Sequence, residues 1–139
     1  HLTHPERLDT VMGCVSDKFR SGVVIPHWCM KLFINAYTTP GTDMNDPRLS
    51  PMFYDASKFP KYVAVACGDA DTLYRMSFDL MKKISGSASG TNVDGSRKFI
   101  CVLNEAHEFN TFGRTRASQE ERDRVEGEAI NMIRASWRQ

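Results

Sequence analysis

The sequence lacks the features that mark several classes of protein. No apolar run reaches the roughly 18 residues that a membrane-spanning helix needs, so we expect no membrane span. Lys and Arg number 18 against 17 Asp and Glu, and this balance argues against a nucleic acid or an anionic membrane as the main partner. The four cysteines show no Cys-x-x-Cys spacing, which argues against a zinc ribbon or a thioredoxin-like motif.

The composition is that of an ordinary globular domain. The chain has 139 residues, of which 41% are hydrophobic, 25% charged and 10% aromatic. His1 and His4 resemble metal ligands, but no third ligand follows at a zinc spacing, so we expect no metal site. We expect no cofactor either. The chain begins without a Met or a secretory leader, so we expect either a removed leader or a piece of a longer protein, and the compartment stays open.

The first half of the chain predicts one helix and one long connection. Apolar side chains recur at helical spacing in residues 26–37, where Pro26 suits a first helical turn. Residues 38–61 hold four of the six prolines, which predicts an extended surface segment.

The second half predicts alternating strands and helices. Residues 62–67 and 99–103 are short continuous apolar runs, typical of strands buried on both faces of a parallel sheet. Residues 72–84 and 118–137 carry apolar residues at helical spacing, with Val125, Ala129, Ile130, Ile133 and Trp137 forming the stripe of the last helix. The small polar residues of 85–97 predict an exposed, mobile loop.

This order of elements predicts an α/β fold, because two strands joined through a helix run parallel. Two parallel strands alone cannot form a sheet that is covered on both faces, and a typical sheet has about five or six strands. We therefore expect the chain to be one end of a larger α/β domain.

Polar side chains follow both predicted strands. Asp69 and Asp71 come after the first strand, and His107 comes after the second. Sites in open α/β sheets form at the carboxyl ends of strands, and neighbouring strands lie ~4.8 Å apart. A carboxylate and a histidine at adjacent strand exits can form an oriented general base. The alternatives are purely structural: a turn-capping role for His107 and a helix N-cap role for Asp71.

The sequence contains no nucleophile to accompany this pair. The elbow motif Gly-x-Ser-x-Gly does not occur, and residues 86–90 have alanine in the central position of a similar pattern. A His-Gly-Gly-Gly oxyanion segment is also missing. The motif search therefore identifies no nucleophile beside the histidine.

Three segments resemble the C-terminal third of an α/β-hydrolase of the hormone-sensitive-lipase-like esterase group. Residues 46–51, Asp-Pro-Arg-Leu-Ser-Pro, resemble its Asp-Pro-x-x-Ser-Pro loop. Residues 62–73 resemble the strand that leads to its Asp-Pro-Leu, although Thr72 stands in place of the Pro. Residues 104–109 resemble its Gly-x-x-His-Gly-Phe turn, although Glu108 stands in place of the second Gly. The likeness covers about residues 20–137.

This resemblance implies that Asp71 is the acid and His107 the base of a Ser-His-Asp triad in a carboxylesterase or lipase. It also implies that an N-terminal fragment of the same protein carries the serine and the oxyanion hole. Residues 1–61 would then hold a connecting helix and loops near a cap, and residues 62–139 the final strand–helix–strand–helix. The substrate would be a small acyl ester.

Several expectations remain open at this point. Phe33 and Tyr37 are candidates for the wall of an acyl pocket, and a homodimer is possible. The Asp–His pair does not discriminate between esters, amides, thioesters and lactones. A non-catalytic relative of the same fold, such as a receptor or binding protein, is the further alternative.

Overall fold

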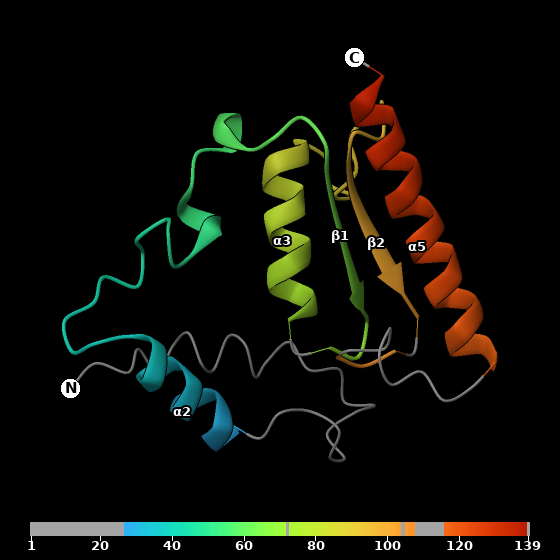
Figure 1. Ribbon diagram of the computed structural model, residues 1–139. Coiled ribbons are helices and arrows are strands. Elements are labelled where there is room, and N and C mark those ends of the chain that lie inside the picture. Colours follow the sequence, from blue (N-terminus) through green and yellow to red (C-terminus); the bar gives the residue numbers. More distant parts are fainter. Residues whose placement is uncertain (1–26, 72, 104, 108–115, 139) are drawn as a thin grey trace.

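The computed structural model describes residues 27–71, 73–103, 105–107 and 116–138. Thr72 and Glu108, the two departures from the esterase pattern, lie outside the described residues. The elements are α2 (His27–Tyr37), η2 (Pro51–Phe53), η3 (Ala56–Lys58), β1 (Val63–Gly68), α3 (Tyr74–Ser85), β2 (Arg97–Val102) and α5 (Arg116–Trp137) (Figure 1). The predicted order of helices and strands is confirmed.

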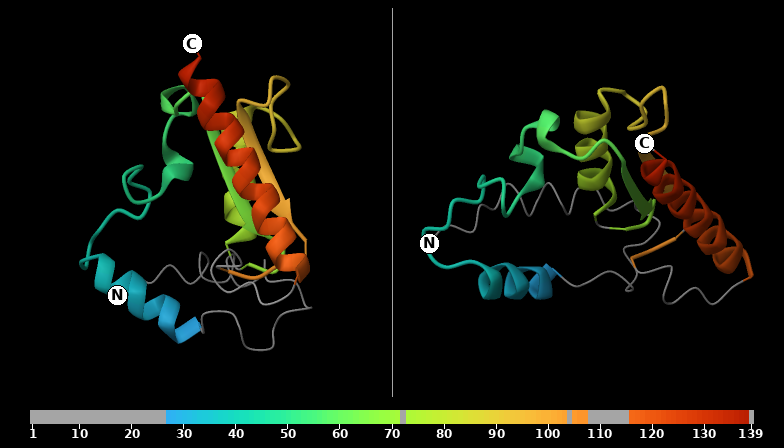
Figure 2. Two further views of the ribbon diagram at one scale, coloured as in Figure 1. Left: turned by 45° about the vertical axis from the view of Figure 1, so that its right-hand side comes forward. Right: turned by 45° about the horizontal axis from the view of Figure 1, so that its top comes forward.

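The two strands form a parallel sheet, as predicted. The register runs from Val63 opposite Arg97 to Gly68 opposite Val102. α3 and α5 lie on opposite sides of the two strands, and both strands run toward the same end of the molecule (Figures 1 and 2). Among the described residues, no helix has the length and apolar character that would let it cross a bilayer.

The core lies between α3 and one face of the sheet. Met81 and Ile84 of α3 are 0% and 2% exposed, and they pack with Cys67 of β1 and Phe99 of β2. Fully burying a side chain of this size contributes about 1.5–3 kcal/mol. Gly86 caps the C-terminal end of α3: its φ of 68° places it in the left-handed region, and its N–H donates to the Lys82 carbonyl.

The other face of β1 is not covered, which corrects the expectation that the strand is buried on both faces. Ala64 and Ala66 are exposed, whereas Cys67 and Gly68 are buried. α5 lies on this side of the strands, but it leaves these two alanines exposed. An alternating strand with one uncovered face results.

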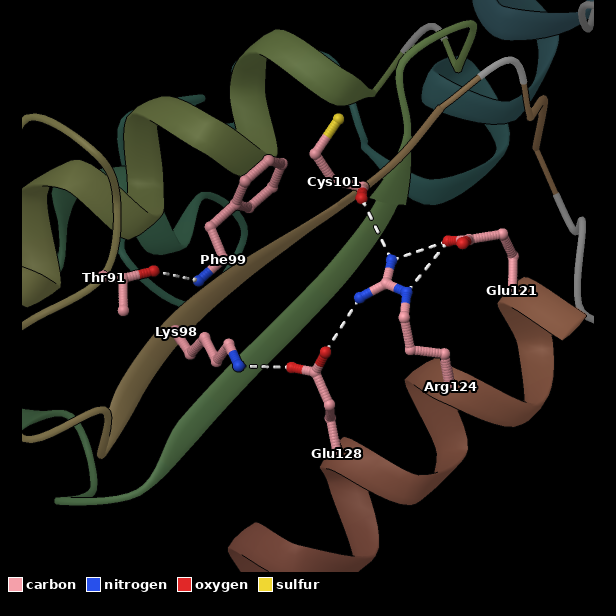
Figure 3. A network of polar contacts seen from close by, with 7 residues as sticks. All are labelled: Thr91, Lys98, Phe99, Cys101, Glu121, Arg124 and Glu128. Atoms are coloured by element: carbon pink, nitrogen blue, oxygen red, sulfur yellow. Dashed lines mark hydrogen bonds and ion pairs between the residues drawn. The ribbon is translucent and has the colours of Figure 1, made fainter.

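α5 attaches to the sheet through charged groups (Figure 3). Arg124 donates to Glu121 at 2.7 Å, to Glu128 at 2.8 Å and to the Cys101 carbonyl at 3.3 Å. Glu128 also forms an ion pair with Lys98 of β2, which lowers the pKa of the carboxyl group. Most of the predicted apolar stripe therefore does not face the sheet: Ile130, Ile133 and Trp137 are 47%, 49% and 81% exposed.

The outer edge of β2 is covered by the chain itself. In the connection before β2, Asn92 accepts at Oδ1 from the Arg97 N–H at 2.9 Å, and its own N–H donates to the Arg97 carbonyl at 3.0 Å. The Phe99 N–H donates to the Gly90 carbonyl at 3.2 Å. Gly90 and Ser96 are buried, so the prediction of an exposed loop is wrong at these two residues.

The outer edge of β1 is bare in the part of the chain that the structure describes. Val63 and Asp69 donate their N–H groups to the Ser96 and Val102 carbonyls, so odd-numbered residues turn toward β2. The N–H and C=O groups of Ala64 and Ala66 therefore point away from β2, and the sheet has no further strand among the described residues.

The connection before β1 is fastened by two basic side chains. Lys83 donates to the Tyr54 carbonyl at 2.8 Å and also to the carbonyl of Met52. Arg97 donates to the carbonyls of Phe59 at 3.3 Å and Ile84. Charged donors thus tie the segment predicted as an extended surface connection to α3 and β2.

Candidate active site

The carboxyl ends of the two strands are joined by backbone hydrogen bonds beyond the sheet. The Asp69 N–H donates to the Val102 carbonyl at 3.0 Å. The next N–H, from Ala70, donates to the Glu105 carbonyl at 3.1 Å. The segment that leaves β2 therefore crosses the end of β1, as the orange trace at the foot of the strands shows (Figure 1).

Asp71 lies in the turn between β1 and α3. Its N–H donates to the Gly68 carbonyl, and its own carbonyl accepts from the Tyr74 N–H, both at 3.1 Å. Its side-chain Oδ1 accepts from the Leu73 N–H at 2.8 Å. Asp71 is only 7% exposed, so the carboxylate is held in one position by hydrogen bonds at the start of α3.

His107 contacts the other oxygen of this carboxylate. Its Nδ1 lies 2.9 Å from Asp71 Oδ2. The Asp71 side chain is 8% exposed and the His107 side chain 38%, so the acid is enclosed while the imidazole remains accessible. Of the two acids that follow β1, Asp69 and Asp71, Asp71 is therefore the one that the structure brings to His107.

This arrangement has a definite chemical capacity. A carboxylate bonded to Nδ1 fixes the tautomer that carries the proton there, and Nε2 is left as the basic nitrogen. The carboxylate also stabilises the imidazolium that forms when Nε2 accepts a proton. The pair is therefore able to transfer one proton between His107 Nε2 and a reacting group placed next to it.

Two further titratable side chains lie on the elements that flank Asp71, Cys67 on β1 and Tyr74 on α3. Burial, followed by the negative charge of Asp71, raises the pKa of the Cys67 thiol to about 12. Burial, followed by a hydrogen bond with Cys101, raises the pKa of the Tyr74 hydroxyl to about 12. Both groups are therefore neutral near pH 7, and Asp71 has a neutral thiol beside it rather than a second anion.

The structure does not bring the two predicted pocket residues to the pair. Phe33 and Tyr37 lie on α2, where they are 59% and 84% exposed. α2 stands away from the sheet, on the side toward which the strands run (Figures 1 and 2). Their assignment to an acyl pocket stays a prediction.

The described part of the chain shows no metal site, and an open cleft in it lies away from the pair. No group of three His, Cys, Asp or Glu side chains there could hold a metal ion. An open cleft of about 390 Å³ is lined by residues that include Tyr62, Lys98, Glu128 and Met132. It lies at the amino ends of the strands, away from His107, and its Lys98 and Glu128 side chains pair with each other.

The backbone contacts that build the site could not be predicted from the residue types that make them. Ala70 and Glu105 contribute an N–H and a carbonyl, which every residue type except proline carries. Cys67 stood in an apolar run and was interpreted as a buried thiol, which its 5% exposure confirms, but its position beside Asp71 was missed. The one available signal was Gly68, which ends the run directly before Asp69.

Comparisons of the chain with protein-family models, curated proteins and solved structures find no match in any of the three.

Proposed function

We propose that this chain supplies the acid and the base of a serine carboxylic-ester hydrolase of the α/β-hydrolase type. The observation that carries the proposal is the 2.9 Å contact between Asp71 Oδ2 and His107 Nδ1 at the carboxyl ends of two parallel strands. The order of Asp71 on the first strand exit and His107 on the next also matches the esterase resemblance in the sequence.

In the proposed reaction, a serine from another part of the protein attacks the ester carbonyl. His107 Nε2 accepts the serine hydroxyl proton as the bond from oxygen to the acyl carbon forms. The same proton is then delivered to the alkoxide as the ester bond breaks, which yields an alcohol and an acyl-serine. A water molecule repeats the sequence and releases the carboxylic acid. The Asp71 carboxylate orients His107 and stabilises the imidazolium.

The bare edge of β1 supports the proposal that the nucleophile comes from outside the chain. The edge carries no charge, proline or bulge, which are the usual devices that protect exposed sheet edges. A further strand can therefore pair with Ala64 and Ala66 and end beside Asp71. The nucleophile and the oxyanion donors would lie on that added part of the sheet.

Covalent labelling of the complete protein tests this proposal. A fluorophosphonate reacts with a serine that is activated by a histidine, and the labelled peptide identifies the nucleophile. We expect labelling on a Gly-x-Ser-x-Gly segment, with a rate that falls by several orders of magnitude in His107→Ala. His27→Ala, which lies on α2 at a distance along the chain from the pair, is the matched control and should label at the normal rate.

The outcome also separates the alternatives. Equal labelling of His107→Ala and the unmodified protein would contradict the proposal. A different residue at the elbow position, with no labelling, would favour a binding protein of the same fold. If labelling occurs, turnover of a panel of chromogenic esters, amides, thioesters and lactones then identifies the acyl substrate.

A further inference from the structure

We infer that Gly68 is a positioning residue, which sets the place of His107 relative to Asp71 because only glycine lets the segment after β2 cross the end of β1. Gly68 is buried, and it lies at the last position of β1 opposite Val102. Its own carbonyl accepts from the Asp71 N–H at 3.1 Å. One residue thus contacts both the turn that holds the acid and the segment that holds the base.

The space around Gly68 excludes any side chain. A Cβ at this position would lie 2.0 Å from the Glu105 carbonyl oxygen and 2.6 Å from its carbonyl carbon. It would also lie 3.2 Å from the Ala106 oxygen. All three atoms belong to the backbone, so they cannot rotate away as the end of a flexible side chain would.

The contact is coupled to the catalytic geometry by a short stretch of chain. The Glu105 carbonyl that would meet the Cβ is the acceptor of the Ala70 N–H, and His107 follows only two residues later. A methyl group at 68 must push the Glu105 carbonyl outward, which breaks the bond to Ala70 and carries His107 away from Asp71. The reason for glycine here is close approach of two backbone segments.

Nuclear magnetic resonance of the isotope-labelled chain tests this directly. In the unmodified protein the ¹⁵N shifts of neutral His107 should report a proton on Nδ1, the tautomer that the Asp71 contact selects. In Gly68→Ala we expect that tautomer signature to be lost while the far-ultraviolet circular dichroism stays native. Gly127→Ala is the matched control, because a Cβ at 127 meets nothing within 4 Å, and it should keep the His107 signature.

A native-like Gly68→Ala protein with an unchanged His107 tautomer would overturn the inference. If Gly68→Ala does not fold, two measurements on the unmodified protein still test the inference. Cross-relaxation between the Gly68 α-protons and the Ala106 amide proton, with slow exchange of the Ala70 amide, supports the inference, and their absence overturns it.

The effect on turnover rests on the proposed function. A displacement of about 1 Å in a reacting group costs roughly 100-fold in rate, so kcat of the complete enzyme should fall about 100-fold in Gly68→Ala with KM little changed. Loss of the tautomer signature in a protein that never hydrolyses esters would contradict the proposed function and leave the positioning role intact. Unchanged His107 geometry in an active esterase would contradict the positioning role alone.

Discussion

The two edges of the sheet differ in how their backbone groups are satisfied. Along β2, outward-facing backbone groups form hydrogen bonds with the preceding connection or with a charged side chain. Asn92 pairs with Arg97, the Gly90 carbonyl accepts from the Phe99 N–H, and Arg124 donates to the Cys101 carbonyl. Along β1, the outward groups of Ala64 and Ala66 have no partner among the described residues. The residues of this second edge are small and uncharged.

This difference indicates which strand ends the sheet. A natural edge strand is protected against pairing, and β2 meets that description while β1 does not. We infer that β2 is the terminal strand and β1 an inner one. The acid then lies on an inner strand and the base on the terminal strand, and the third member of the proposed triad comes from beyond β1.

The largest effect is expected from a pair of proline substitutions in β1. Val65 turns its N–H toward β2, so Val65→Pro removes a ladder bond and should lower the free energy of unfolding by about 2–4 kcal/mol. The Ala66 N–H points away from β2, so Ala66→Pro should cost less than about 1 kcal/mol in this chain. Urea denaturation measures both. Equal losses would mean that β1 has no bare side.

In the complete protein the same pair should behave differently. There Ala66→Pro removes the donor that the proposed next strand would need, and we expect loss of assembly and of turnover as severe as that of Val65→Pro. Full activity of the Ala66→Pro protein would show that β1 is a true edge.

Substitution of Arg97 on β2 tests how much this protected strand contributes to stability. Arg97→Ala leaves the carbonyls of Phe59 and Ile84 without their charged donor, and we expect the free energy of unfolding to fall by about 2–3 kcal/mol. Arg134→Ala, at an exposed position of α5, should change it by less than about 0.5 kcal/mol. Similar losses for the two arginines in thermal or urea unfolding would show that the Arg97 contacts do not stabilise the fold.

Asn92 gives the smallest of these effects. Asn92→Ala removes the acceptor of the Arg97 N–H and a bond to the Ser96 hydroxyl, which should cost about 1–2 kcal/mol. The neighbouring Val93 is fully exposed, and Val93→Ser should cost less than about 0.5 kcal/mol. Amide hydrogen exchange provides a second measure, because the Arg97 amide should exchange faster in Asn92→Ala only.

The parts of this structure that could be predicted from sequence are those that depend on the local spacing of apolar residues. Continuous apolar runs that end at Cys67 and Leu103 predicted both strands, and helical spacing predicted α3 and α5, with ends that differ by at most two residues. The meeting of Asp71 and His107 followed from a general rule, that side chains after neighbouring parallel strands share one end of the sheet.

The parts that could not be predicted depend on long-range backbone contacts. Arg97 and Arg124 reach carbonyls far away in the sequence, and nothing near either residue signals its acceptor. The same holds for Gly68, whose neighbour is the Glu105 carbonyl. The exposure of Ile130 and Trp137 was missed for a related reason: helical spacing reveals an apolar stripe but not the surface that it meets.

The central claim is that Asp71 and His107 act together in acyl transfer, and the most direct test compares the two acids at the end of β1. Turnover of a chromogenic ester is measured for the complete protein with Asp71→Asn and with Asp69→Asn. We expect kcat to fall by roughly 10⁴-fold in Asp71→Asn, because the neutral amide no longer fixes the tautomer of His107 or stabilises the imidazolium. Asp69→Asn should stay within about threefold of the unmodified enzyme. Equal turnover by the two variants would contradict the account.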